Sequence, residues 1–172
     1  HFWEMRFLLE GKKPILHGTK VGIGAVLIAR LYELLREQGL SKEEILTKTQ
    51  PEGANWEEEI NKAFLDSAAE VILLEKEAQK NSLDAWSERI KVIAERWEQI
   101  YQVLATVPLA EEIVGLIKAV DGVVDPGEVG IEPDLVKQGL LYAKEVRPRY
   151  TILQLLWDLG YLQEYAQTIL GG

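Results

Sequence analysis

Apolar residues recur at intervals of three and four along most of this chain, which is the periodicity of helices with one buried face. The clearest case begins at Ser82, where Glu, Lys and Arg fill the positions between a stripe formed by Ile90, Ile93, Trp97, Ile100, Tyr101 and Leu104. No run shows the strict two-residue alternation of a half-buried strand. The sequence therefore predicts an all-α fold, with one multi-helix domain over residues 1–172.

Capping residues and helix breakers predict where the helices begin and end. Ser41 with Glu44, and Asn55 with Glu58, have capping-box spacing. The segment Asn55–Lys80 contains no proline and no glycine, so it is predicted to be one long helix that ends at Asn81-Ser82. Further helices are predicted from near Thr19 to a left-handed cap at Gly39, from Pro108 to about Val120, from Asp134 to Glu145, from Tyr150 to Leu159 and from Tyr161, with one long loop at Asp121–Pro133.

The composition excludes several functional classes. The 172 residues include no cysteine, so a disulfide scaffold, a cysteine zinc site and a thiol nucleophile are excluded. With 19 basic and 28 acidic side chains the net charge is −9, which gives no general attraction to nucleic acids or anionic membranes. The longest apolar stretch, Val21–Leu35, is interrupted by Arg30 and Glu33 and is too short and too charged to span a bilayer. We therefore expect no nucleic-acid partner and no membrane partner.

The first residue, His1, is not a start methionine, and the residues after it do not have the pattern of an export signal. We therefore expect the chain to be an internal or C-terminal piece of a longer protein, and its location to be cytoplasmic.

Only His1 and His17 can supply imidazole chemistry. His17 precedes Gly18 and a glycine-rich helix start, where free N–H groups and the helix dipole favour an anion, although a packing role for His17 is the simpler alternative. Two histidines can also converge on a metal, and Glu4 or Glu10 could complete the ligand set. A solvated helix face is the alternative for either glutamate.

Two other groups of residues have both a functional and a structural interpretation. Arg147-Pro148-Arg149-Tyr150 forms a compact cationic segment that could hold a phosphate or pair with carboxylates and helix ends. Trp56, Trp86 and Trp97 could anchor a protein partner, but burial in the core is the more common fate of such residues.

Segments at both ends of the chain resemble a known family. His1-Phe2-Trp3-Glu4-Met5 followed by Leu16-His17-Gly18-Thr19-Lys20-Val21-Gly22, together with Val146-Arg147-Pro148-Arg149-Tyr150-Thr151-Ile152-Leu153 and Leu159-Gly160, is similar to the second half of the sn-glycerol-1-phosphate dehydrogenases. These enzymes belong to the iron-containing alcohol dehydrogenase and dehydroquinate synthase-like group. The middle of the chain, about 51–104, carries little that matches.

The resemblance implies a fold and a division of labour. Such enzymes have an N-terminal α/β domain that binds the nicotinamide cofactor and a C-terminal all-helical domain, with a metal held between them by an aspartate and two histidines. The chain would then be the helical domain alone, and its partner would be the upstream nucleotide-binding domain. A homo-oligomer is compatible with this assignment.

The resemblance also implies roles for individual residues. His17 matches the second metal-ligand histidine, and the other two ligands would lie upstream of residue 1. His1 matches a histidine that lines the cleft and is a catalytic candidate for protonating the alkoxide. Lys20 is the nearest cation for a substrate phosphate, with Arg147 and Arg149 as further candidates. Thr19 departs from the family pattern, because many relatives have glutamate at this position.

The reaction implied is hydride transfer between NAD(P)H and dihydroxyacetone phosphate, a step of phospholipid metabolism. The metal, zinc first with nickel or iron as alternatives, would polarise the carbonyl. The isolated chain is expected to bind neither NAD(P) nor metal and to be inactive. The alternatives are a dehydroquinate synthase or a polyol dehydrogenase of the same fold group, and a noncatalytic helical interaction domain.

Overall fold

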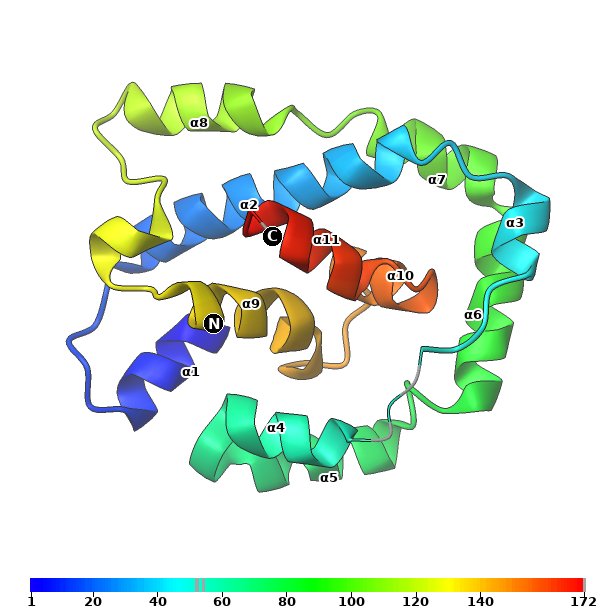
Figure 1. The fold of residues 1–172 in the computed structure, drawn as a ribbon, viewed down its shortest axis with the longest axis horizontal. Helices are drawn as coiled ribbons and strands as arrows, with labels where there is room; N and C mark the ends of the chain where they lie inside the picture. Colours follow the sequence, from blue (N-terminus) through cyan, green and yellow to red (C-terminus); the bar gives the residue numbers. More distant parts are fainter. Residues whose placement is uncertain (52, 54, 172) are drawn as a thin grey trace.

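The computed structural model describes residues 1–51, 53 and 55–171. These residues form eleven α-helices and three short 3₁₀-helices and contain no strand, which confirms the all-α prediction (Figure 1). The first half of the chain forms α1 (Phe2–Leu9), α2 (His17–Glu37), α3 (Lys42–Leu46), α4 (Trp56–Phe64), η1 (Leu65–Ser67) and α5 (Ala68–Ala78). The second half forms α6 (Leu83–Glu95), α7 (Trp97–Leu104), α8 (Ala110–Lys118), η2 (Pro126–Val129), α9 (Pro133–Tyr142), η3 (Ala143–Glu145), α10 (Ile152–Asp158) and α11 (Leu162–Ile169).

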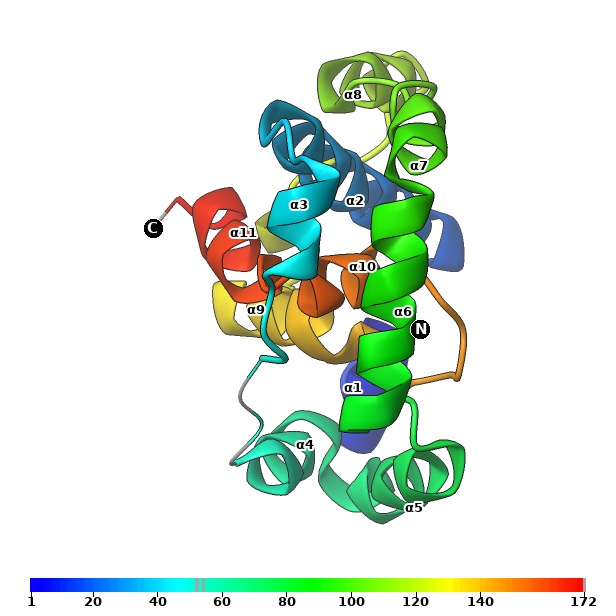
Figure 2. The same ribbon diagram turned by 90° about the vertical axis from the view of Figure 1, so that its right-hand side faces the viewer.

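The short helix α10 lies at the centre of the molecule and packs against α2, α6 and α11 (Figures 1 and 2). Its apolar residues Ile152, Leu153, Leu155 and Leu156 are all buried, and so is the polar Gln154 on the opposite side of the helix. Asp158, at its end, is 0% exposed and accepts two hydrogen bonds of 2.8 Å from Arg89 of α6. A helix that is buried around its circumference needs neighbours on every side, and α10 has them.

The long helix α2 carries two packing surfaces. Ile23, Leu31 and Leu35 belong to the main core. Val26 and Ala29 instead pack against Ala110 and Val114 of α8 in a small separate cluster. Figure 1 shows α8 as an outer helix that runs along α2 at the edge of the molecule. None of the helices described combines the length and the apolar character needed to cross a bilayer.

The prediction of one helix over Asn55–Lys80 is wrong. The helix breaks at Leu65, whose φ of 50° and ψ of −126° are not helical, and α5 folds back against α4 as a hairpin. Two apolar faces, one with Ile60 and the other with Val71, are thereby buried on the same side of the molecule. A single straight helix would leave one of them in solvent, so tertiary packing overrides the local helical preference.

The segment that begins at Ser82 is helical but divided. Arg96 leaves the helical conformation, with φ of −109° and ψ of 13°, so that α6 and α7 form two helices where one was expected. The predicted apolar stripe is nevertheless largely correct, because Ile90, Ile93, Trp97 and Leu104 are buried. Tyr101, also placed in the stripe, is exposed.

Most of the predicted helix ends are close to those observed. Ser41 and Glu44 form the expected capping box, and Ser82 caps α6 by accepting a hydrogen bond from the Ala85 N–H. Gly39 has a φ of 59°, the left-handed conformation expected of it after α2. Some details differ: Asn55 makes no side-chain capping bond, Pro108 precedes the first turn of α8, and α2 begins at His17 rather than near Thr19. The predicted loop at Asp121–Pro133 also contains η2, and the helix predicted to end at Glu145 continues beyond Tyr142 only as η3.

Candidate functional site

Helix α1 is held in one orientation by its buried face. The Trp3 indole N–H donates a hydrogen bond of 3.1 Å to the Leu135 carbonyl on α9, and Phe2 packs edge-on against Phe64 with 5.3 Å between ring centroids. Gly139 permits this approach, because a Cβ there would lie 2.8 Å from the Trp3 nitrogen. Helix α1 accordingly packs against α9. With this face buried, His1 and Glu4 occupy the other side of α1.

Helix α2 begins beside them and brings two more candidate residues. His17 is its first residue, and Lys20 follows one turn later. The His1 and His17 rings lie 5.8 Å apart between centroids. The two histidines, which the sequence allows to converge from adjacent elements, thus lie side by side at the meeting of α1 and α2.

Glu4 lies at the centre of this group. Its Oε2 is 3.9 Å from Nδ1 of His1 and 3.7 Å from Nδ1 of His17, and its Oε1 is 3.4 Å from Nζ of Lys20. The hydrogen bond and charge of Lys20 lower the pKa of Glu4. Because Nδ1 of each ring faces the carboxylate, Nε2 is left on the opposite side of the ring, where it is available for another partner.

Lys20 differs from the other members in its burial. Its side chain is 6% exposed, whereas both histidine side chains are 61% exposed. Its ammonium group reaches Glu4, which compensates the charge of a group that is otherwise shielded from water. The sequence leaves two roles open for Glu4, a place on a solvated helix face and a role as a metal ligand. In the structure Glu4 forms an ionic link between α1 and α2.

Three of these four residues, His1, His17 and Lys20, line a cavity of about 220 Å³. Besides His1, His17 and Lys20, its lining residues come from α1, α2, the α9–η3 region and α10 and are mostly small or apolar: Phe2, Trp3, Val21, Gly24, Leu27, Ile28, Gly139, Leu140, Ala143 and Leu153. Gly24 has no atom within 4 Å of an ideal Cβ position, so its missing side chain leaves open space. The site is therefore a small apolar recess with two imidazoles and a compensated ion pair at its edge.

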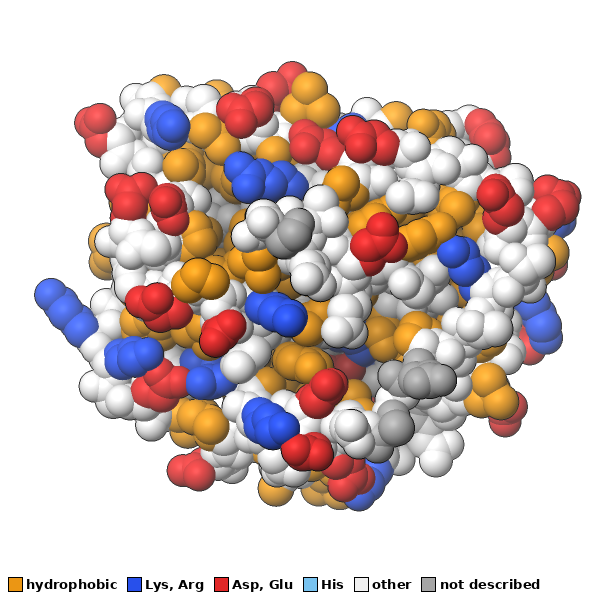
Figure 3. Space-filling model, viewed as in Figure 1, with side chains coloured by type: hydrophobic (Ala, Val, Ile, Leu, Met, Phe, Trp, Pro, Cys, Tyr) orange, Lys and Arg blue, Asp and Glu red, His pale blue; other side chains and the backbone are white. Residues whose placement is uncertain are grey.

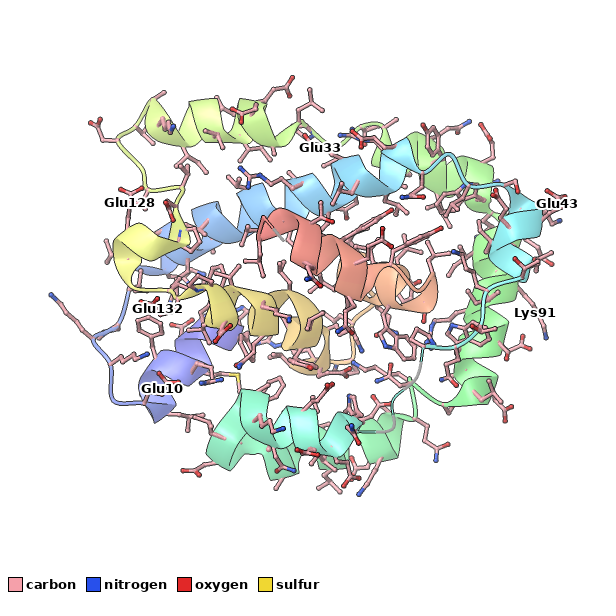
Figure 4. All side chains as sticks on the ribbon, in the orientation of Figure 1. Glu10, Glu33, Glu43, Lys91, Glu128 and Glu132 are labelled. Atoms are coloured by element: carbon pink, nitrogen blue, oxygen red, sulfur yellow. The ribbon has the colours of Figure 1, made fainter. Side chains whose placement is uncertain are left out.

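Other residues considered from the sequence lie outside this group. Glu10 pairs with Arg6 at 2.5 Å and with Lys12 at 2.6 Å. Figure 4 shows Glu10 at the far end of α1. Arg147 and Arg149 are exposed in the segment between η3 and α10. Trp86 and Trp97 are buried in the core, which removes them as anchors for a partner.

A complete metal site is not formed by these side chains. Across residues 1–51, 53 and 55–171, no group of three or more His, Cys, Asp or Glu side chains is placed to hold a metal ion. A catalytic metal such as zinc needs about three protein ligands. The described residues thus supply too few ligands to hold a catalytic metal by themselves. They do not by themselves define a metal-dependent reaction step.

Comparison with known proteins relates the chain to one group of enzymes. It is 27% identical over 157 residues to the glycerol-1-phosphate dehydrogenase [NAD(P)+] of Geobacillus thermodenitrificans, which is 91% of this chain and 30% of that protein. It is 27% identical over 164 residues to the enzyme of the same name from Geobacillus stearothermophilus, with 95% and 32% covered. The chain is similar to the glycerol-1-phosphate dehydrogenases.

The similarity covers only part of each relative. The chain spans about a third of the length of its curated glycerol-1-phosphate dehydrogenase relatives and aligns with their C-terminal part. The same holds for the glycerol-1-phosphate dehydrogenase of Halalkalibacterium halodurans, of which the chain covers 29%. No family model matches the chain, and no solved structure matches it significantly. The resemblance inferred from the sequence motifs is thus confirmed at the level of the glycerol-1-phosphate dehydrogenase group.

Proposed function

We propose that this chain is the helical, substrate-side domain of an NAD(P)-linked oxidoreductase of the glycerol-1-phosphate dehydrogenase type, located in the cytoplasm. The observation that carries the proposal is the similarity to enzymes of that name over 91% and 95% of the chain. The position of His1, His17 and Lys20 around one recess supports it, because these are the residues that the motif resemblance picks out. The names of these relatives also favour this reaction over those of a dehydroquinate synthase or a polyol dehydrogenase.

In this proposal His17 contributes one ligand, through Nε2, to a divalent metal such as zinc whose other ligands lie outside the described residues. Glu4 lies 3.7 Å from Nδ1 of the same ring, and its charge favours the orientation in which Nε2 is free to bind. His1 lies beside His17 and delivers a proton to the substrate oxygen as the carbonyl is reduced. The nicotinamide binds to a separate nucleotide-binding domain, and the chain by itself is inactive.

The substrate of this proposal is dihydroxyacetone phosphate, which needs a cationic partner for its phosphate. Lys20 is that partner, and it must then share its ammonium group between the phosphate and Glu4. The apolar walls of the recess exclude water from the carbon skeleton of the substrate.

The test uses the longer protein that contains this chain and follows NAD(P)H oxidation with dihydroxyacetone phosphate. We expect His17→Ala to abolish both turnover and bound metal, and Glu4→Gln to lower metal affinity about 10–100-fold. Glu43→Ala is the control, because Glu43 is exposed on α3 at the opposite end of the molecule (Figure 4). Unchanged turnover and metal content in His17→Ala would refute the proposed role of His17.

A further inference from the structure

The outer side of α8 carries an apolar stripe that the rest of the described chain leaves largely exposed. Its residues recur at intervals of four, three and four: Leu109, Ile113, Leu116 and Val120. Leu116 is 72% exposed and Val120 is 77% exposed, while Ile113 is half-buried at the edge of the contact with α2. Apolar side chains at this spacing form a continuous line along a helix, as in the seam of a coiled coil.

This outer stripe is separate from the face by which α8 is attached to the molecule. Ala110 and Val114 form the attached face, and they pack on Val26 and Ala29 of α2 in a cluster of only four buried residues. With 3.6 residues per turn, the outer stripe lies about 100° around the helix from that face. Helix α8 therefore has apolar residues on two faces, of which the structure buries one. A contiguous exposed apolar patch, unlike single exposed apolar residues, is typical of an interaction site.

The outer stripe faces the same side of the molecule as the chain start. Glu111 and Lys118 lie on the opposite side of α8 and line a cavity beside α11 and η2, so the stripe faces away from α11. In Figure 2 α11 lies on the left and the chain start on the right. Two further exposed apolar residues extend this surface, Val103 of α7 before the start of α8 and Val21 of α2 beside its end.

The spacing of the outer stripe is the same when it is read in either direction. When two copies of α8 lie antiparallel, Leu109 of one copy therefore lies opposite Val120 of the other, and Ile113 lies opposite Leu116. Each contact is then made twice about a twofold axis. A surface that fits itself in this way suits a second copy of the chain, because a twofold contact requires a self-complementary patch.

The charges of α8 are compatible with this antiparallel pairing. Glu111 and Lys118 lie on the side away from the outer stripe and are exposed. Glu112 flanks the stripe, and its Oε2 accepts a hydrogen bond of 3.3 Å from the Leu109 N–H. The flanking residue opposite Glu112 in the second copy is Ala119. The pairing thus brings no like charges of α8 together, which would disfavour association.

We propose that the outer stripe of α8 is the contact of a twofold-symmetric dimer, in which the α8 helices of two copies of this chain pack antiparallel. The antiparallel arrangement also brings Val103 of one copy to the end of α8 where Val21 of the other copy lies. Two short helices bury less surface than an obligate dimer does, so the dimer forms and dissociates reversibly. The inference concerns assembly and is independent of the proposed oxidoreductase function.

Sedimentation equilibrium of the 172-residue chain at about 10 to 500 µM measures this assembly. We expect a monomer–dimer equilibrium without larger species, because a twofold contact is closed. Leu116→Glu places a charge within the stripe and should raise the dissociation constant of the dimer about tenfold or more. Leu73→Glu is the matched control and should leave the dissociation constant unchanged, because Leu73 is 57% exposed on α5 at the opposite edge of the molecule (Figure 1). Circular dichroism verifies that both variants keep their helices.

Disulfide cross-linking tests the direction of the helices, and the absence of cysteine from the chain makes it specific. Leu109 and Val120 are about 16 Å apart along one helix, too far for a disulfide within one copy. We expect a disulfide-linked dimer when Leu109→Cys and Val120→Cys are mixed, and none from either variant alone.

Three results would overturn the proposal. They are a chain that stays monomeric at the highest concentration, equal dissociation constants for the two glutamate variants, and efficient cross-linking of Leu109→Cys with itself. The first of these results would leave the outer stripe to a different partner, such as another domain of the longer protein.

Discussion

At the scale of single residues, the structure shows which parts of the histidine site are readable from sequence. His1, His17 and Lys20 are found because histidines are scarce and the motif around them is recognisable. The central position of Glu4 has no such signal, since it is one of 28 acidic residues and only the crossing of α1 and α2 brings it between the rings. The cavity between the α4–α5 hairpin and the α10–α11 region gives no local signal either, because its walls come from segments far apart in the sequence.

Gly139 tests whether close packing of α1 on α9 holds the site residues in place. A Cβ at this position would lie 2.8 Å from the Trp3 nitrogen, so Gly139→Ala must displace the indole and weaken its bond to Leu135. We expect a loss of about 1–3 kcal/mol in the free energy of unfolding, measured in urea. The control is Gly115→Ala within α8, where no atom lies within 4 Å, and it should be neutral or stabilising. Equal effects of the two substitutions would contradict this account.

Glu145 is a buried carboxylate with two cationic partners, Lys80 at 2.6 Å and the adjacent Lys144. Burial acts to raise the pKa of Glu145, but the two lysines outweigh it and hold the pKa below its ordinary value. Glu145→Gln leaves the buried Lys144 charge without its carboxylate and should cost about 3–5 kcal/mol of stability at neutral pH. Lys144→Met should cost less, because Glu145 then keeps Lys80.

The pH dependence of this effect has a definite sign. A carboxyl group with a lowered folded-state pKa stabilises the fold fully above its unfolded pKa, about 4.3 for glutamate, and loses that contribution as the pH falls through the folded value. The difference in unfolding free energy between the protein and Glu145→Gln should thus shrink as the pH falls below about 4. Denaturant titrations at a series of pH values measure it, and a difference that is constant down to pH 2 would argue against the ion pair.

At the scale of elements, helix content is readable from sequence and helix breaks are not. The apolar periodicity, Gly39, Ser41 and Ser82 predict helices and caps that the structure contains. The turn at Leu65 contains no glycine or proline that would predict it from sequence. It is imposed instead by the packing of α4 on α5. Local pattern therefore predicts which residues are helical better than it predicts how the helices are divided.

Leu65 provides a test of that turn. Its φ of 50° with ψ of −126° is a conformation that glycine adopts far more readily than a residue with a side chain. Leu65→Gly should consequently be more stable than Leu65→Ala by about 1 kcal/mol or more, measured by thermal or urea unfolding. If position 65 were helical the order would be reversed, because alanine is favoured over glycine within a helix. An alanine variant as stable as the glycine variant would therefore contradict the hairpin.

At the scale of the whole molecule, the stability should be uneven. Helix α8 is held mainly by a cluster of four buried residues on α2 and α8 and by Glu33, whose Oε1 accepts a hydrogen bond of 2.6 Å from the Ala110 N–H. Figure 4 shows Glu33 between α2 and the start of α8. The remaining helices share the much larger main core. Figure 3 shows acidic and basic side chains interspersed over one face, so no large patch of like charge destabilises the fold there.

Native-state hydrogen exchange measures this difference. We expect amides of α8 to exchange through local opening with a lower free energy than amides of α10, which should exchange only on global unfolding. Glu33→Ala, which removes the acceptor for the Ala110 N–H, should lower the protection of α8 further while leaving α10 unchanged. Uniform protection across both helices would show that the small cluster is cooperative with the main core.

The central position of α10 has a consequence for synthesis on the ribosome. Of the helices that α10 contacts most, α2 and α6 precede it in the chain and only α11 follows. As the nascent chain emerges, Ile23, Leu31 and Leu35 of α2 thus have no completed core to enter until residues 152–158 have been translated. The growing chain must carry exposed apolar helices for most of its elongation, so its yield in cells should depend on chaperones that shield such surfaces more than on its final stability.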